Sequence, residues 1–214
     1  MKAKLQRYLQ KAFGIWPPCR LNNLNHPYSI GAQFHVRFEL GGELANGTKE
    51  RVEQATWRAV ALFEETFTNK EEAIWVLSYR YLGESLFGKD RGRGFLQQQF
   101  SGAQYAGFYK KLETVYSAGE SKSKAKIVIG KIKLKDLKYR IILNAIANTE
   151  MGFKPNLDEI VFFIGARTNR IFHMYDDRGC LIESNALNDI RELYLGKNEW
   201  IVDYHRPEIA KQFH

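Results

Sequence analysis

The fold is decided by the stretch Ile160–Glu183, which reads IVFFIGARTNRIFHMYDDRGCLIE. Apolar segments alternate in it with turn residues, in the order 160–164, Arg167-Thr168-Asn169, 171–175, Asp176-Asp177-Arg178-Gly179 and 180–183. Such a pattern is typical of β-hairpins, because Asp, Asn and Gly readily adopt the tight turns that connect antiparallel strands. The stretch therefore predicts a three-stranded antiparallel meander.

On both sides of this meander the sequence predicts helices and further strands. Residues 34–40 alternate apolar and polar side chains, which indicates a strand with one buried face, and residues 73–82 are rich in strand-forming residues. Apolar residues recur at helical spacing in segments at 5–13, 49–67 and 137–151, and Pro207 fits the start of a closing helix. We therefore expect one α+β domain over residues 1–214, in which helices pack on a mostly antiparallel sheet.

Residues 83–123 are the least regular part of the sequence. They are rich in glycine and contain three adjacent glutamines, Gln97 to Gln99. A long stretch without periodicity is unusual inside a compact domain and is often mobile or functional. We predict an irregular insertion with the character of a mobile loop, containing one short aromatic-rich helix at 105–116.

The composition excludes several classes of protein. The chain has 214 residues, of which 44% are hydrophobic and 26% are charged, so it is neither disordered nor a coiled coil. Its longest apolar run, 160–164, is far too short to span a membrane. No secretory signal is recognisable, and Cys19 and Cys180 lack the spacing of a disulfide scaffold or a zinc site. We expect a cytoplasmic protein without a membrane partner.

Positive charge is concentrated in the middle of the chain. The net charge is +8, and residues 110–140 hold ten basic and three acidic residues. Lysines alternate with aliphatic residues on both sides of Gly130. They occupy even-numbered positions before Gly130 and odd-numbered positions after it. We predict a β-bulge at Gly130 that places five lysines on one face of a strand: Lys124, Lys126, Lys131, Lys133 and Lys135. A lysine face of this kind can bind an acidic partner or nucleic acid, and it also protects an edge strand from pairing with other chains.

Arg91 and Arg93 extend the nucleic-acid hypothesis. They form an Arg-Gly-Arg-Gly stretch near Phe87 and Phe95. Arginines and aromatic rings stack on the bases of single-stranded nucleic acids. A nucleic-acid-binding module that uses these arginines and the five lysines is therefore one alternative function.

Two catalytic motifs have simpler explanations. Residues 83–89 match the G-x-x-x-x-G-K part of a phosphate-binding loop, but Asp90 stands where such a loop needs Ser or Thr. Asp176 and Asp177 define a hypothetical metal site of a hydrolase, yet neighbouring residues of an extended chain point in opposite directions. Asp-Asp-Arg-Gly is sufficiently explained as a turn. We predict no metal, cofactor or catalytic residue, and the metal-dependent hydrolase is a second alternative.

Two C-terminal strings resemble a known bacterial family. His173-Met-Tyr-Asp-Asp-Arg-Gly179 and Trp200-Ile-Val-Asp-Tyr-His-Arg206 are similar to the signature of the domain of unknown function 3885, and weaker similar blocks occur at 37–40, 58–67 and 145–148. Cys180 departs from the acidic or small apolar residue that we expect in relatives. The resemblance brings no known activity to this sequence, and it suggests an immunity-type or toxin-associated interaction protein.

We therefore expect a non-enzymatic protein that binds a macromolecular partner. The turn after 171–175 and the aromatic residues near the C-terminus would form a rigid acidic and aromatic contact patch. Its residues are Tyr175, Asp176, Asp177, Arg178, Trp200, Asp203 and Tyr204. The lysine face would meet an acidic region of the partner. Burial of the patch residues inside the monomer would exclude this interpretation.

Overall fold

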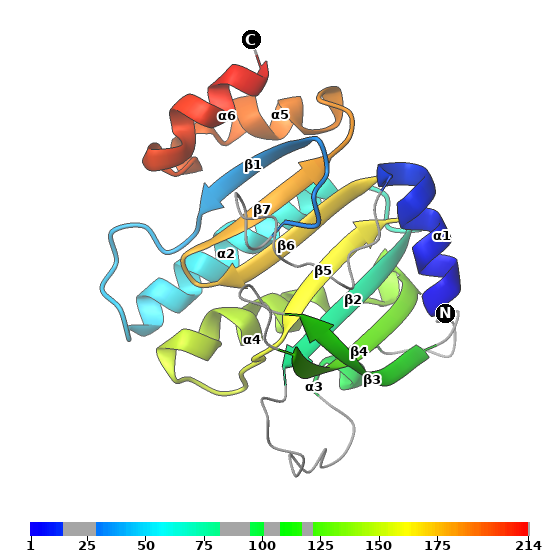
Figure 1. Ribbon diagram of the computed structural model, residues 1–214. Coiled ribbons are helices and arrows are strands. Elements are labelled where there is room, and N and C mark those ends of the chain that lie inside the picture. The colour runs from blue at the N-terminus through cyan, green and yellow to red at the C-terminus, as the bar shows by residue number, and fades with distance from the viewer. Residues whose placement is uncertain (15–28, 82–94, 101–107, 117–121, 214) are drawn as a thin grey trace.

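Seven antiparallel strands form one sheet at the centre of the protein (Figure 1). The computed structural model describes residues 1–14, 29–81, 95–100, 108–116 and 122–213, without the side chains of 81, 108–116 and 122–125. The strands are β1 (Phe34–Glu39), β2 (Ala73–Tyr81), β3 (Phe108–Tyr116), β4 (Lys122–Lys133), β5 (Ile160–Gly165), β6 (Arg170–Asp176) and β7 (Gly179–Ser184). Their order in the sheet is β1-β7-β6-β5-β2-β4-β3, and this architecture confirms the predicted α+β class.

The predicted meander is the middle of this sheet. β5 pairs with β6 and β6 pairs with β7, both antiparallel. The β6–β7 connection is tight, since Asp176 already pairs with Gly179. β1 extends the sheet beside β7, and β2 extends it beside β5. Strands from distant parts of the sequence are therefore added to both sides of a locally formed unit.

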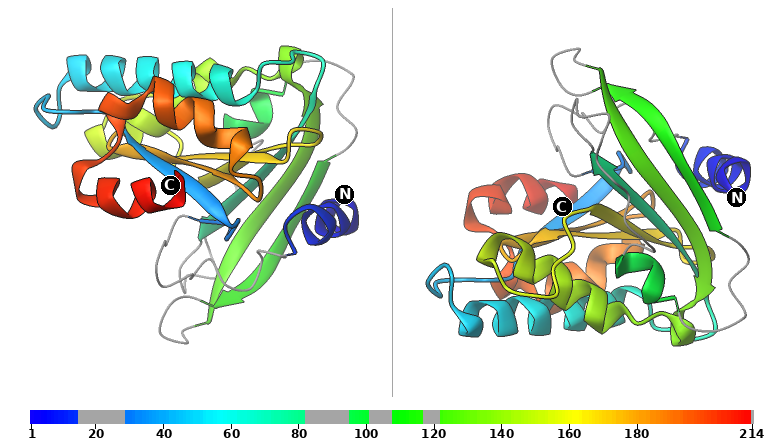
Figure 2. Two further views of the ribbon diagram at one scale, coloured as in Figure 1. Left: turned by 90° about the horizontal axis from the view of Figure 1, so that it is seen from above. Right: turned by 90° about the horizontal axis from the view of Figure 1, so that it is seen from below.

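Helices cover both faces of the sheet (Figure 2). On one face lie α2 (Lys49–Thr66) and α4 (Tyr139–Met151), and on the other lies α1 (Lys2–Phe13). The elements α5 (Asn188–Gly196) and α6 (Arg206–Phe213) contact β1, and α3 (Phe95–Gln98) is a single short turn. Three 3₁₀ turns complete the described elements: η2 (Leu134–Asp136), η3 (Asn198–Trp200) and η4 (Asp203–His205). No helix among the described residues combines the length and the apolar character needed to cross a membrane.

The sheet separates two apolar cores because successive strand residues point to opposite faces. In β2, Ile74 and Val76 belong to the larger core under α2 and α4, whereas Trp75 and Leu77 belong to the smaller core under α1. α2 begins at Lys49 because Thr48 caps it, its hydroxyl accepting a hydrogen bond from the Arg51 backbone N–H.

The sequence prediction was wrong for parts of 83–123. Its described residues include α3, all of β3 and the first residues of β4. The segment 108–116, expected to be helical, is a strand that pairs with β4 along its whole length. Pairing with a neighbouring strand therefore overrides the weak local helical pattern.

The predicted bulge at Gly130 is also wrong. Leu77, Val76 and Trp75 pair in unbroken register with Ile129, Gly130 and Lys131. β4 lies inside the sheet between β2 and β3, so an extra residue would disturb two hydrogen-bonded ladders. Strict alternation continues through Gly130, and the five lysines therefore do not share a face.

Candidate functional site

The Asp176–Gly179 turn is a buried structural element. Asp176 and Asp177 are both buried, which contradicts their predicted role in a contact patch. Asp176 accepts hydrogen bonds from the backbone N–H and the Nε of Arg178, each at 2.8 Å. Asp177 accepts a hydrogen bond from Nε of Arg51 at 2.5 Å. The turn therefore fixes its own shape and connects the sheet to the start of α2.

The same contacts argue against a metal-dependent hydrolase at this turn. The two carboxylates bind different guanidinium groups, those of Arg178 and Arg51, instead of converging on one point. No group of three or more metal-ligating side chains occurs within the described parts of the chain.

The other residues of the predicted patch differ in their exposure. Trp200 is only 8% exposed and lies edge-on against Trp57, with ring centroids 5.3 Å apart. Tyr175 is half-buried and accepts a hydrogen bond from Nε of Arg37 at 2.9 Å. Arg178, Asp203 and Tyr204 are exposed. The assignment of Trp200 to a contact surface was therefore wrong, because the ring of Trp57 covers it.

The predicted lysine face is divided. Lys126 is buried, and Nζ of Lys131 lies 4.7 Å from the centroid of the Trp75 ring. Lys133 and Lys135 share the carboxylate of Glu71, at 2.9 and 2.6 Å. Their hydrogen bonds lower the pKa of Glu71, Lys135 being the larger cause. The side chain of Lys124, and all of Arg91 and Arg93, lie outside the described residues.

Cys180 and His173 do not form a nucleophile–base pair. Cys180 pairs with Met174 and His173 pairs with Leu181, so the two side chains lie on opposite faces of the sheet. Complete burial raises the pKa of the Cys180 thiol far above its usual range, so the thiol is protonated at neutral pH. Burial also lowers the pKa of His173 from 6.5 to about 4. Both residues are part of the packed interior.

The low pKa of His173 makes stability depend on pH. The unfolded chain binds a proton near pH 6.5, whereas folded His173 binds one only near pH 4, so its contribution to stability is fully present above 6.5 and is lost as the pH falls towards 4. We expect a loss of about 3 kcal/mol over this interval. His173→Gln should remove this pH-dependent part of the stability. Urea unfolding of the wild type and of the variant at several pH values would measure the difference. Equal pH dependence in both proteins would contradict the assignment.

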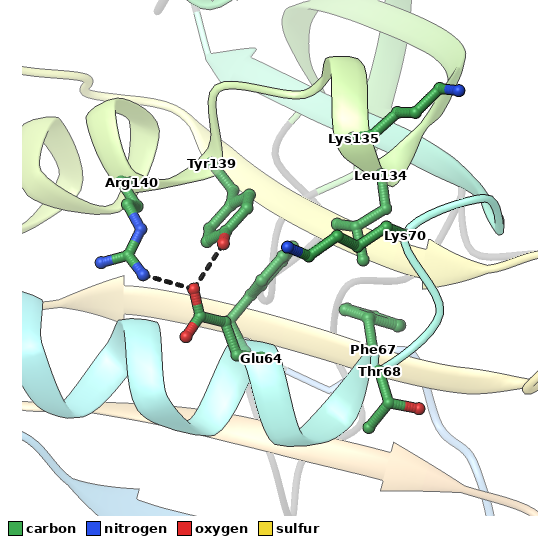
Figure 3. Close-up of a pocket in the computed structure, with 9 residues that line it drawn as sticks. Glu64, Phe67, Thr68, Lys70, Leu134, Lys135, Tyr139 and Arg140 are labelled. Carbon is green, nitrogen blue, oxygen red and sulfur yellow. Dashed lines mark hydrogen bonds and ion pairs between the residues drawn. The ribbon is translucent and has the colours of Figure 1, made fainter.

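A cleft between the end of α2 and the start of α4 is the best candidate site among the described residues (Figure 3). Its volume is about 730 Å³. The lining combines aromatic, basic and acidic side chains: Phe63, Glu64, Phe67, Thr68, Lys70, Leu134, Lys135, Tyr139 and Arg140. The backbone N–H of Lys135 donates to the Lys70 carbonyl at 3.0 Å and thereby fastens the loop after α2 to η2. Elements about seventy residues apart in sequence thus form one cavity.

Glu64 organises one side of the cleft. Its Oε1 accepts hydrogen bonds from the Tyr139 hydroxyl and from Arg140, both at 2.5 Å (Figure 3). The Tyr139 ring stacks on the ring of buried Phe63, with centroids 4.6 Å apart. Burial, and then the hydrogen bond to Glu64, raise the pKa of Tyr139, so its hydroxyl is a stable donor at neutral pH. This side of the cleft is therefore held in place before any ligand arrives.

Lys70 is the cation available to a ligand. Its side chain extends towards the side of the cleft where Tyr139 and Glu64 lie, whereas Lys135 extends away from them (Figure 3). Lys70 makes no ion pair with any residue that the structure describes. The lining thus carries three cations and one carboxylate beside aromatic walls. This arrangement suits an anionic group attached to an apolar one.

Sequence reasoning did not identify this cleft. Glu64 appeared only within a helical block, and Lys70 and Tyr139 belong to no recognisable motif. The only usable signal was the basic segment 110–140, in which Lys135 and Arg140 border the cleft. The fold itself brings the remaining residues to that segment.

The protein thus combines an α+β fold with a cleft lined by polar and aromatic side chains. The chain belongs to the family described as Domain of unknown function (DUF3885), whose profile matches residues 7–205. The predicted membership of this family is therefore confirmed.

A curated protein is similar to part of the chain. The chain is 32% identical over 78 residues to "Uncharacterized protein YnaE" of Bacillus subtilis (strain 168). The alignment covers 34% of this chain and 37% of that relative. No solved structure matches the chain.

Proposed function

We propose that the protein is a non-enzymatic interaction protein that binds an acidic segment of a protein partner in the α2–α4 cleft. The observation that carries the proposal is the unpaired ammonium of Lys70 beside a prearranged aromatic wall. A carboxylate of the partner would contact Lys70, and an adjacent apolar side chain would pack against the partly exposed ring of Tyr139. Charge complementarity then selects the partner, and apolar burial adds affinity.

Nucleic acid fits the described cations less well. Binding to a phosphate backbone requires several unneutralised cations along one surface. Lys133 and Lys135 share Glu71, Lys126 is buried, and Lys131 lies over Trp75. One available ammonium in a cleft favours a localised carboxylate over an extended polyanion.

A more specific form of this proposal is that the protein acts as an immunity protein. In that role the partner is a toxin, and occupation of the cleft by an acidic segment of the toxin neutralises it. Coexpression with the product of the adjacent gene tests this role: rescue of growth that Lys70→Glu abolishes supports it, and rescue that the variant leaves intact contradicts it.

The binding proposal is tested by photo-crosslinking from the cleft. A photoreactive amino acid at exposed Thr68 captures a partner in cells, and the partner is then purified for titration. We expect the crosslinked peptide to be acidic and Lys70→Glu to weaken binding at least about tenfold, equivalent to about 1.4 kcal/mol.

Lys49→Glu is the matched control, because Lys49 is exposed at the opposite end of α2. Its affinity should equal that of the wild type. A nucleic-acid crosslink, or equal affinities of the Lys70 and Lys49 variants, would refute the proposal.

A further inference from the structure

Trp57 is an unusually exposed aromatic residue on the outer face of α2. Its side chain is 62% exposed, although large aromatic residues are usually covered. The ring lies edge-on against Trp200 and is held by it. Single exposed apolar residues are common on protein surfaces, so the neighbours of Trp57 decide whether it carries a function.

The neighbours of Trp57 on α2 form an acidic stripe. Glu50 and Glu53 precede it by seven and four residues, and Ala61 and Glu65 follow it by four and eight, so all lie along one side of the helix. Glu50, Glu53 and Glu65 are exposed. Glu50 and Glu53 make no ion pair within the described structure, whereas Glu65 binds Lys197 at 2.8 Å. The stripe thus presents two free carboxylates beside one indole ring.

The cations near Trp57 are directed at a different ring. The Arg58 guanidinium and Nζ of Lys197 each lie 5.2 Å from the centroid of Trp200, and Arg58 also donates to the Glu39 carbonyl. They hold Trp200 in place under Trp57. The exposed ring of Trp57 is therefore available to a cation from outside, and tryptophan is the aromatic residue that binds cations best.

We propose that the stripe Glu50–Glu53–Trp57 is a docking surface for an arginine-rich segment of a protein partner. A guanidinium group stacks on Trp57, and neighbouring basic side chains pair with Glu50 and Glu53. This surface would bind a positively charged segment, whereas the α2–α4 cleft would bind a negatively charged one. Helix α2 therefore borders two surfaces that select segments of opposite charge. This inference does not depend on the proposed function of the cleft.

The test is an NMR titration of the ¹⁵N-labelled full chain at low ionic strength with acetylated hexa-arginine amide as the probe. We expect shifts of the Trp57 indole N–H and of the backbone of 50–61, and no comparable shifts with hexa-glutamate. Trp57→Leu keeps an apolar cover over Trp200 and should weaken binding at least about fivefold. Glu50→Lys with Glu53→Lys should weaken it at least about tenfold.

Glu150→Lys is the matched control, because Glu150 is exposed at the end of α4. It should bind hexa-arginine as the wild type does. Shifts confined to another surface, unchanged affinity of the Trp57 variant, or burial of Trp57 in a dimer of the free protein would overturn the inference.

Discussion

Replacing Asp177 by alanine is expected to lower the free energy of unfolding by about 3 to 5 kcal/mol, because it removes one partner of a buried ion pair. The Asp177 carboxylate is fully buried and bound to Arg51, which is itself buried. Without it, the Arg51 guanidinium retains only the carbonyls of Gly42 and Leu44 as partners among the described residues. A buried charge would then lack its counter-charge.

Urea unfolding of Asp177→Ala and Asp203→Ala measures this effect. Asp203 is an exposed carboxylate that pairs with Arg206, so its removal should change stability by less than about 1 kcal/mol. A double variant, Arg51→Leu with Asp177→Leu, should recover part of the loss because neither charge is left unpaired. Equal stabilities of the two single variants would contradict the structural role of the turn.

Glu183→Ala is expected to lower the free energy of unfolding by about 3 kcal/mol. The buried Glu183 carboxylate accepts hydrogen bonds from the Ser29 hydroxyl and from the backbone N–H groups of Ile30, Gly31 and Ala32. Alanine would remove this acceptor from the Ser29 hydroxyl and from the Ile30 and Ala32 N–H groups, whereas the Gly31 N–H would keep the Ser29 hydroxyl oxygen as an acceptor. Segment 29–32 would lose its attachment to β7.

Hydrogen exchange locates this effect. The amides of 30–32 should lose protection in Glu183→Ala, whereas those of α2 and α4 should lose protection only through the global loss of stability. Glu192→Ala is the control, since Glu192 is exposed on α5. Retained protection at 30–32 would contradict the role assigned to Glu183.

The locally encoded parts of the fold were predictable from the sequence. The meander carries its turn residues between its strands, and α2 has both an apolar stripe and a capping threonine at Thr48. In both cases the signal that predicts the element lies within the element or directly beside it in sequence. The edge strand β3 was not predictable, because its conformation depends on pairing with β4.

The candidate site depends on contacts between distant residues. Glu64 and Tyr139 meet only because α2 and α4 pack side by side, and Lys70 joins them through the loop fastened to η2. The acidic turn attracted a functional interpretation, but its carboxylates bind arginines within the monomer. Charged residues alone do not reveal whether their partners are internal.

The exposure of Trp57 was recoverable from the helical pattern. The buried stripe of α2 contains Val52, Ala55, Ala59 and Phe63, and Trp57 falls on the other side of the helix. Trp200, by contrast, offered no periodic signal, because it belongs to a 3₁₀ turn.

A charge-swap cycle between Lys70 and the partner tests the central claim most directly. Once crosslinking has identified the acidic residue that contacts the cleft, Lys70→Glu is combined with the substitution of that residue by lysine, and all four affinities are measured. We expect each single change to weaken binding at least about tenfold and the double change to restore most of the affinity. Additive losses without recovery would contradict the proposal that Lys70 in the α2–α4 cleft recognises an acidic segment.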